Sequence, residues 1–397
     1  MEIDFLAWGN LAVRWLHLIA GISWIGASFY FVWLDNSLRP PNPPKQGVGG
    51  ELWAVHGGGF YHNEKFLIAP PELPEHLHWF KWEAYTTWLS GIALMILIYY
   101  IGADLYLIDR VKIDLTQGQA IAIGLAAIVG GWLVYDVLCK SPLGRNQPLF
   151  TLVWFALLTG AAFGLTKIFS DKGAFLHVGA LIGTVMAANV FFVIIPNQRK
   201  SVAAMIAGEA PDPALGIMGK QRSVHNNYMT LPVLLIMISG HYPMLVGHRF
   251  NWLLLAGIGA ASLLIRHYFN LRNRGQERRA LLAGGAAVFL ATMGVASVKP
   301  QIARGGAAAG GEIAFADVQA IIDRHCTVCH SAAPAHELFS EPPNGRTLDS
   351  EEEIRRTAAL IYDQVIATDI MPLGNETGMT ADERAVLGAW IEQEGLR

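Results

Sequence analysis

AFLHVGALIGTVMAANVFFVII, residues 174–195, contains no charged side chain. An α-helix rises about 1.5 Å per residue, so a run of this length can cross the hydrocarbon core of a bilayer. Its glycine and alanine residues are typical of membrane helices that pack closely against other helices. The stretch therefore predicts a transmembrane helix inside a bundle.

Other apolar runs of similar length predict further spans along the first three quarters of the chain. The eight expected spans cover approximately residues 11–34, 84–103, 119–139, 149–169, 174–195, 229–247, 251–268 and 280–298. The chain of 397 residues is 53% hydrophobic and only 15% charged, which is too few charges for an ordinary soluble protein. The expected fold is all-α and begins with a polytopic transmembrane helix bundle of about eight spans.

A different signal, CTVCH, occupies Cys326 to His330 near the carboxyl end. In C-x-x-C-H two thiols bond the vinyl groups of one porphyrin, and the adjacent imidazole then binds the iron of a c-type haem. C-x-x-C alone would also suit a redox dithiol. A four-cysteine zinc site is excluded, because the chain has only 3 cysteines. We expect one covalently attached haem c, bound through Cys326 and Cys329.

The surroundings of this motif resemble a small class I cytochrome c. FADVQAIIDRH before it and TADERAVLGAWIEQ after it predict short amphipathic helices. DIMPLG between them supplies Met371, a thioether that would face His330 across the iron. Met379 is the alternative sixth ligand, and methionine is also common as a core residue. The expected iron ligands are His330 and Met371.

The composition divides the chain into two domains joined by a linker. The Gly/Ala-rich stretch KPQIARGGAAAGGE has little to bury, so it predicts a flexible connection. We expect a transmembrane domain over residues 1–299, a linker over 300–312 and a cytochrome c domain over 313–397.

Haem c is attached outside the cytoplasm, so the cytochrome domain is expected in the periplasm of a bacterium. Eight spans then place both chain ends outside, and the loops left inside contain most of the Lys and Arg residues, as cytoplasmic loops do. The expected location is the bacterial inner membrane, with the lipid bilayer as a partner. No dense basic patch indicates nucleic-acid binding.

Histidines within apolar sequence are functional candidates. His17, His177 and His241 are expected at similar depth near the outer ends of their spans, and any two could hold a haem b in the membrane domain. A lone buried histidine is also commonly a hydrogen-bonded core residue. A second, inner group could form a substrate pocket or another haem site and consists of His56, His62, His76, His78, His225 and His267.

Three long stretches of unusual composition are GELWAVHGGGFYH (50–62), LHWFKWEAYTTWLSG (77–91) and SVHNNYMTLPV (223–233). In these stretches the chain resembles the bacterial membrane-bound urate oxidases that are linked to cytochrome c, and the resemblance extends over essentially the whole chain. It implies oxidation of urate to 5-hydroxyisourate without hydrogen peroxide formation. Electrons would leave through the haem c to a respiratory terminal oxidase or a soluble cytochrome c.

A purine site requires an aromatic face together with amide and charged hydrogen-bonding partners. The candidate catalytic residues are His225, Asn226, His56, His62, Glu64 and Glu83, and Asn227 is a further amide beside them. Glu83 and Asp35 could transfer the released protons. Because urate gives up two electrons and a haem accepts one, a haem b in the membrane domain would ease the transfer. HGGGF lacks the lysine of a phosphate loop and predicts a tight turn.

Two other functions remain open from the sequence. The first is electron transfer from quinol to the cytochrome without a soluble substrate. The second is handling of haem or copper, because H-L-x-x-G-x-x-W-x-G in the first span resembles small membrane families of that kind. This second resemblance covers a single helix.

Overall fold

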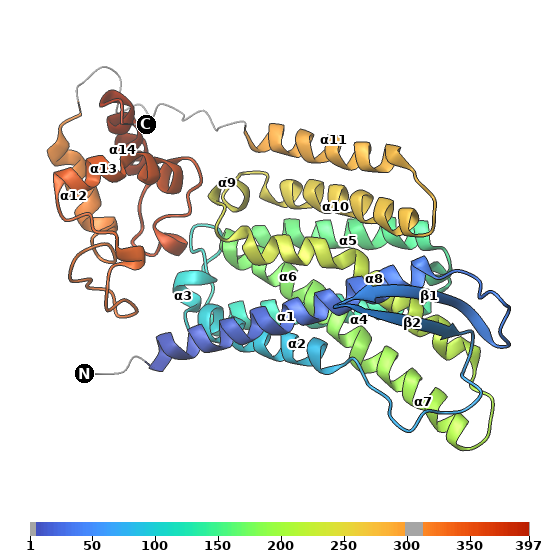
Figure 1. Cartoon of the computed structure of the whole chain (residues 1–397). Coiled ribbons are helices and arrows are strands. Elements are labelled where there is room, and N and C mark those ends of the chain that lie inside the picture. Colours follow the sequence, from blue (N-terminus) through green and yellow to red (C-terminus); the bar gives the residue numbers. More distant parts are fainter. Residues whose placement is uncertain (1–4, 298–312, 397) are drawn as a thin grey trace.

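The computed structural model describes residues 5–297 and 313–396, so the predicted linker lies outside the described residues. Figure 1 shows long helices side by side, with a smaller group of helices at one end of this bundle. The long helices are α1 (Phe5–Ser37), α2 (Trp82–Met95), α4 (Gln117–Lys140), α5 (Gln147–Thr166), α6 (Asp171–Ala188), α8 (Pro213–Ser239), α10 (Asn251–Asn273) and α11 (Arg279–Ala296). Shorter helices connect them: α3 (Ala103–Tyr106), α7 (Ile195–Ile206) and α9 (Pro243–Val246).

Within the described residues, six helices are long and apolar enough to cross a membrane. They are α1, α4, α5, α10, α11 and the continuous helix Asp171–Ile206, in which a π-helical segment, Asn189–Ile194, joins α6 to α7. These six coincide with six of the eight predicted spans. The second predicted span lies in α2 and its π-helical continuation, Ile96–Tyr100; α2 itself is only 14 residues long.

The sixth predicted span, 229–247, has the wrong bounds. Helix α8 begins at Pro213 and ends at Ser239, so the residues after Ser239 are not part of it. The prediction missed the first half of α8 because its side chains are polar. Among them, Arg222, His225 and Asn226 are buried and hydrogen-bonded to other helices, which hydropathy alone does not reveal.

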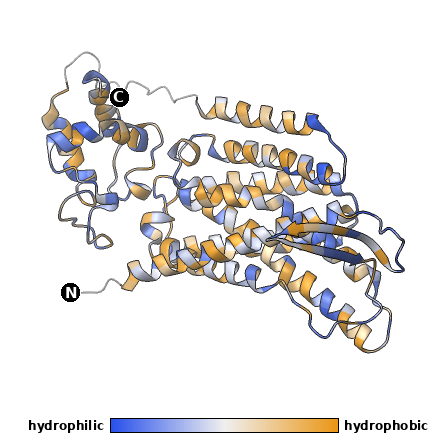
Figure 2. Ribbon diagram, viewed as in Figure 1, coloured by the Kyte–Doolittle hydropathy of each residue, from blue (hydrophilic) through white to orange (hydrophobic). Residues whose placement is uncertain are grey.

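The outer surface of the bundle is apolar. Only 6% of the residues in the apolar stretch of α11 are buried, and Trp15, Ile22 and Leu290 are among many large side chains that are exposed. Figure 2 shows hydrophobic residues along the whole length of the bundle helices. Apolar surface of this extent suits contact with lipid rather than with water.

Helix α6 is the most buried element, since it packs against α2, α4, α5 and α8. Small residues permit these close contacts. A Cβ atom built at Gly124 of α4 would lie 2.5 Å from Nε2 of His177, and one built at Gly131 would lie 2.6 Å from the Leu181 side chain. The glycines of α4 therefore set how closely α6 can approach.

The all-α prediction is wrong for one segment, because part of the first long loop forms a hairpin. Strands β1 (Val48–His56) and β2 (Gly59–Phe66) pair in antiparallel register at the end of the bundle where α7 lies (Figure 1). Gly57 and Gly58 connect them with φ of +59° and +81°. Positive φ at both positions suits a two-residue hairpin turn, so the prediction of a tight turn at HGGGF is confirmed.

The C-terminal region contains three helices around one core: α12 (Phe315–His325), α13 (Glu351–Ile361) and α14 (Ala381–Gln393). Helices α12 and α14 confirm the two amphipathic helices predicted beside the C-x-x-C-H motif. Their buried faces meet at Ile322, Leu387 and Trp390. The assignment of this region as a class I cytochrome c stays a prediction.

The C-terminal region packs against α3 and α9 of the bundle. A Cβ atom at Gly374 would lie 2.8 Å from the Ile108 carbonyl oxygen, and one at Gly247 would meet the Thr368 side chain. The first turn of α1 lies at the same end of the bundle (Figure 1). Which side of the membrane this end faces stays a prediction.

Replacing Gly124 with alanine is expected to destabilise the bundle by about 1–3 kcal/mol, because the new methyl group would overlap the His177 ring. Gly130→Ala on the same helix is the control, since a Cβ there meets nothing within 4 Å. Alanine also favours helix over glycine, so the control should be neutral or slightly stabilised. The stability of both variants is measured by thermal unfolding in detergent. Equal unfolding midpoints for the two variants would refute the packing argument.

A second prediction concerns Glu383 at the start of α14. The backbone N–H of Thr380 and neighbouring groups, including the hydroxyl of Thr380 and the ring of His325, lower the pKa of Glu383 to about 2. A carboxyl with a lowered pKa stabilises the fold above its ordinary pKa near 4.5, and this stabilisation is lost as the pH falls toward 2.

Glu383→Gln should therefore speed amide hydrogen exchange in α14 by about fivefold at pH near 6, corresponding to roughly 1 kcal/mol for one such partly exposed contact. The difference from the wild type should shrink at pH near 2.5. A difference that is equal at both pH values would mean that the charge of Glu383 does not contribute.

Candidate functional site

A cleft of about 630 Å³ opens at the end of the bundle that bears the hairpin, between α1, α7, α8, α10 and β2. This volume is in the range of small-molecule sites. Its aromatic lining includes Trp24, Phe31, Phe66, Phe80 and Tyr228. Its polar lining includes Asp35, Asn36, Asn63, Glu64, Lys65, Asn197, Gln198, Lys220, Asn226, Asn270 and Arg274. The cleft therefore combines flat apolar faces with amide and charged groups.

The charges in the cleft are arranged around Asp35. Its carboxylate contacts Lys65 and lies 2.9 Å from Nζ of Lys220. Nε of Arg274 donates a hydrogen bond of 2.8 Å to Asn36 on the next position of α1. The cleft lining thus has two carboxylates, Asp35 and Glu64. It has three cationic side chains, which are Lys65, Lys220 and Arg274. One positive charge is left over, so the site suits a monoanion.

His225 lies outside the cleft lining, in a buried polar network between α4, α5 and α8. The Tyr135 hydroxyl accepts a hydrogen bond of 3.0 Å from the Asn189 amide and lies 2.8 Å from Nδ1 of His225. Nε2 of His225 lies 2.8 Å from Oε1 of Gln147. These partners assign a neutral imidazole with its proton on Nε2, donating to Gln147, so both ring nitrogens already have partners.

Asn226 connects this network to the cleft. Its Oδ1 accepts a hydrogen bond of 2.8 Å from Asn189, and its Nδ2 donates to the Met186 carbonyl. Asn226 also belongs to the cleft lining. Arg222 completes the network, because it donates to Asn189 and pairs with Asp136 at 2.8 Å. The network therefore fixes one wall of the cleft.

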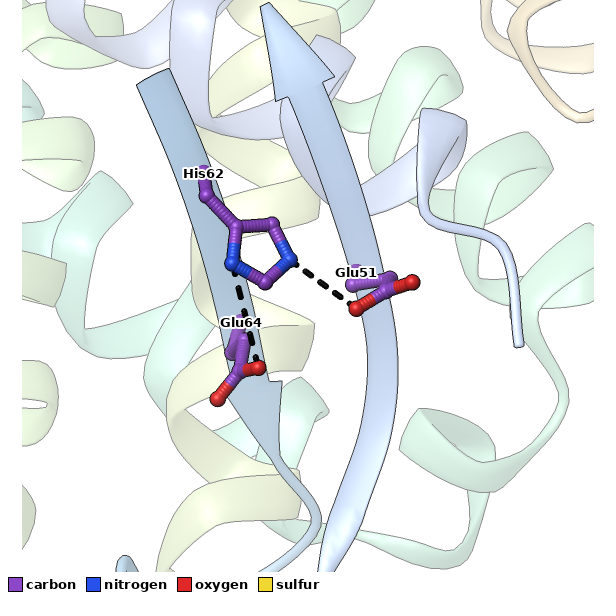
Figure 3. A group of neighbouring side chains, drawn as sticks. All are labelled: Glu51, His62 and Glu64. Atoms are coloured by element: carbon purple, nitrogen blue, oxygen red, sulfur yellow. Dashed lines mark hydrogen bonds and ion pairs between the residues drawn. The ribbon is translucent and has the colours of Figure 1, made fainter. Parts of the chain in front are cut away.

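The predicted residues of the first loop lie on the hairpin. Nε2 of His62 lies 2.9 Å from Oε2 of Glu51. Figure 3 shows Glu64 beside the other ring nitrogen. Possible ligand atoms of these three residues lie within 4.8 Å of one another, as in a metal site. However, Nζ of Lys45 already contacts both carboxylates. The hydrogen bond from His62 lowers the pKa of Glu51. The hydrogen bond from Lys45 to Glu64 raises the pKa of Lys45. The group is thus satisfied as ion pairs.

The structure brings together only part of the predicted catalytic set. Asn226 and Glu64 line the cleft, and His62 lies next to Glu64. His56 is exposed at the hairpin turn, and Glu83 lies in the first turn of α2; neither lines the cleft. Asp35, predicted as a proton carrier, does line it. Other inner residues are elsewhere: His76 and His78 are exposed, and His267 bonds to Tyr228.

The three histidines predicted for a haem b differ in their surroundings. His177 is fully buried, and its Nδ1 donates to the Gly173 carbonyl while its Nε2 accepts from Tyr100 at 3.3 Å. Nδ1 of His17 is 3.0 Å from the Thr87 carbonyl. His241 is exposed beyond the end of α8. The Nδ1 bond of His177 is of a kind common for ligating histidines, whereas its Nε2 is bonded to Tyr100, so a haem b held by two of these histidines stays a prediction.

The C-x-x-C-H motif fits the attachment of a c-type haem. His330 N–H bonds back to the Cys326 carbonyl at 2.8 Å, so the motif forms one further turn after α12. Nδ1 of His330 donates to the Arg346 carbonyl, which leaves Nε2 for the iron, a common arrangement for ligating histidines. Burial raises the pKa of the Cys326 thiol to about 12, unlike the thiols of redox-active C-x-x-C motifs.

Met371 and Met379 differ in burial. Met379 is 3% exposed and packs in the core of the C-terminal region, whereas Met371 is partly exposed. Arg384 donates hydrogen bonds to the carbonyls of Met371 and Val365 and so fixes the loop that contains Met371. Met371 is therefore the better placed of the two as an iron ligand.

The sequence did not reveal Asn63, Lys220, Asn270 or Arg274 as site residues. One signal was available, because Arg266, Asn270 and Arg274 follow one another at intervals of four residues. This spacing places them on one face of a helix, and a polar face is unusual within an apolar span. Asn63 and Lys220 gave no comparable signal.

Comparison with known proteins provides one match. A family model described as urate oxidase N-terminal matches residues 4–297, which is most of the chain and includes the whole bundle. No curated protein and no solved structure matches the chain. The match ends before the C-terminal helices, so the fused cytochrome c stays a prediction.

Proposed function

Because the chain belongs to the urate oxidase N-terminal family, we propose that it oxidises urate to 5-hydroxyisourate and transfers the electrons to a c-type haem in its own C-terminal region. The balanced step is urate plus water to 5-hydroxyisourate, two protons and two electrons. The electrons would then pass to a terminal oxidase or a soluble cytochrome c, and no hydrogen peroxide would form. The observation that supports this proposal best is the cationic, amide-rich cleft within the matched region.

Urate matches the chemistry of this cleft. It is a flat heterocycle that is a monoanion at neutral pH, with C=O and N–H groups around its rim. The side chains of Lys220 and Arg274 supply positive charge, and the asparagines supply donors and acceptors. The aromatic residues Trp24 and Phe80 offer apolar faces for the ring.

The released protons require acceptors close to the substrate. Asp35 and Glu64 are the carboxylates that line the cleft, so we assign proton transfer to them. His225 acts as a positioning residue, because it reaches the cleft only through Tyr135, Asn189 and Asn226. Glu83 receives no role, since it does not line the cleft.

The electron acceptor is assigned to the C-terminal region. Cys326 and Cys329 would bond the porphyrin, and His330 and Met371 would bind the iron. When bound, the haem supplies a one-electron acceptor, so urate must give up its electrons one at a time. Tyr106 of α3 lies at the contact between the two regions, and burial raises the pKa of Tyr106.

We place the protein in the bacterial inner membrane, with the C-terminal region in the periplasm. The hairpin end, which contains the cleft, lies opposite the C-terminal helices (Figure 1). Urate would therefore enter from the cytoplasmic side, where loops rich in Lys and Arg are expected.

The direct test is optical. In the oxidised, full-length protein purified in detergent without oxygen, urate should reduce the c-type haem, whereas xanthine should not. Lys220→Met should raise the urate concentration for half-maximal rate at least tenfold, because a charge-assisted contact of about 1.5–3 kcal/mol is removed. Lys200→Met on α7 is the control, since Lys200 does not line the cleft.

Two results would count against the proposal. Reduction by a quinol but not by urate would favour the alternative, electron transfer from quinol to the cytochrome without a soluble substrate. If Lys220→Met and Lys200→Met need the same urate concentration for half-maximal rate, urate is not bound in this cleft.

A further prediction concerns the contact between the two regions. Gly374→Ala places a methyl group against the Ile108 carbonyl and should slow haem reduction by urate at least fivefold, if docking loses about 1 kcal/mol or more. Gly378→Ala is matched, because Gly378 also has positive φ (+70° against +59°) but has nothing within 4 Å. Stopped-flow absorbance measures the rates, and the haem spectrum should be unchanged in both. Equal rates in the two variants would show that this contact is not needed.

A further inference from the structure

A buried acceptor without a partner lies in the wall of the cleft. Asn270 on α10 lines the cleft and is only 6% exposed, and its Oδ1 atom is buried without a hydrogen bond. A buried carbonyl oxygen without a partner costs about 1–3 kcal/mol. Such groups are uncommon in folded proteins, and one that borders a ligand-sized cleft suggests that a ligand supplies the missing donor.

The orientation of the Asn270 amide follows from its neighbours. Arg266 has only donors and directs Nε to Oδ1 of Asn227 at 2.8 Å, so Asn227 must present its oxygen to Arg266. Nδ2 of Asn270 donates to that same oxygen at 3.1 Å. Turning the Asn270 amide over would bring two oxygens together. The chain from Arg266 through Asn227 therefore fixes Asn270 with its oxygen away from Asn227.

The Arg266 guanidinium is itself held in place. Its Cζ atom lies 4.1 Å from the centroid of the Phe29 ring, a cation–π contact with α1. The acceptor is therefore preorganised by contacts among α1, α8 and α10 before any ligand binds. On the hairpin side of the cleft, Nδ2 of Asn63 is also buried without a partner and can serve as a donor.

We propose that Asn270 is a specificity-determining residue that accepts a hydrogen bond from a ring N–H of the bound heterocycle. The identity of that heterocycle as urate rests on the proposed function. Asn63 would donate to a carbonyl group on the same ligand. A site of this kind discriminates strongly against a ligand that lacks the matching N–H, because the buried oxygen then stays without a partner.

Methylation of single ring nitrogens provides the test. Binding of urate and of each singly N-methylated urate to the full-length protein is measured by calorimetry without oxygen. The proteins are the wild type, Asn270→Ala and Asn251→Ala. Asn251 is the matched control, because it is a buried asparagine on the same helix that does not line the cleft.

The wild type and Asn251→Ala should bind urate alike, and should bind one methylated isomer at least tenfold more weakly. Asn270→Ala should bind urate at least tenfold more weakly and should lose the discrimination against that isomer. Asn270→Leu, which retains the side-chain volume, should behave in the same way and replaces the alanine variant if that variant does not fold.

The outcomes separate the two proposals. If the wild type binds urate and the Asn270 variants match it in affinity and in discrimination, the role of Asn270 is wrong while urate oxidation stands. If the wild type binds neither urate nor any methylated isomer, the proposed function is wrong, and the assignment of Asn270 as a urate contact is wrong with it.

Discussion

Hydrogen bonds among Asn189, Tyr135 and Asn226 join the helix that contains α6 to α4 and α8. The surrounding lipid would not by itself drive these helices together. Apolar surfaces gain little by leaving lipid for one another, so close packing and buried polar contacts decide how membrane helices associate. Here Arg222 and Asp136 extend the contacts from α8 to α4. Since these groups are paired, the polar stretch of α8 around Arg222, His225 and Asn226 can lie inside the bundle. That placement in turn forms the wall of the cleft.

The sequence predicted well the features that depend on neighbouring residues. Apolar runs located six membrane-length helices, the glycines of HGGGF indicated the turn, and amphipathic periodicity located α12 and α14. The hairpin and the start of α8 escaped prediction for a shared reason. Their residues are stabilised by contacts with distant segments, such as the pairing of Lys65 with Asp35, and local hydropathy contains no record of such contacts.

The site was predicted in part. Histidine attracted attention because it is rare in apolar sequence, yet the rings of His225 and His177 have both nitrogens bonded within the protein. The more informative residue, Asn270, is an amide whose importance depends on Arg266 and Asn227 together. A property that arises from three side chains on two helices becomes visible only when the helices are placed side by side. The C-x-x-C-H motif is the opposite case, because its chemistry is contained in five consecutive residues.

The separation of the cleft from the C-terminal helices has an electrical consequence. These parts lie at opposite ends of an apolar bundle (Figure 1), so an electron that leaves the cleft end and reaches the other end crosses most of the bilayer. Moving one elementary charge across a membrane changes its energy by about 2.3 kcal/mol per 100 mV. With the C-terminal region outside, each electron would move toward the positive face of the membrane, a direction that the membrane potential assists. The released protons would remain on the negative face. The turnover of such an enzyme would then depend on the voltage of its own membrane and would partly discharge it.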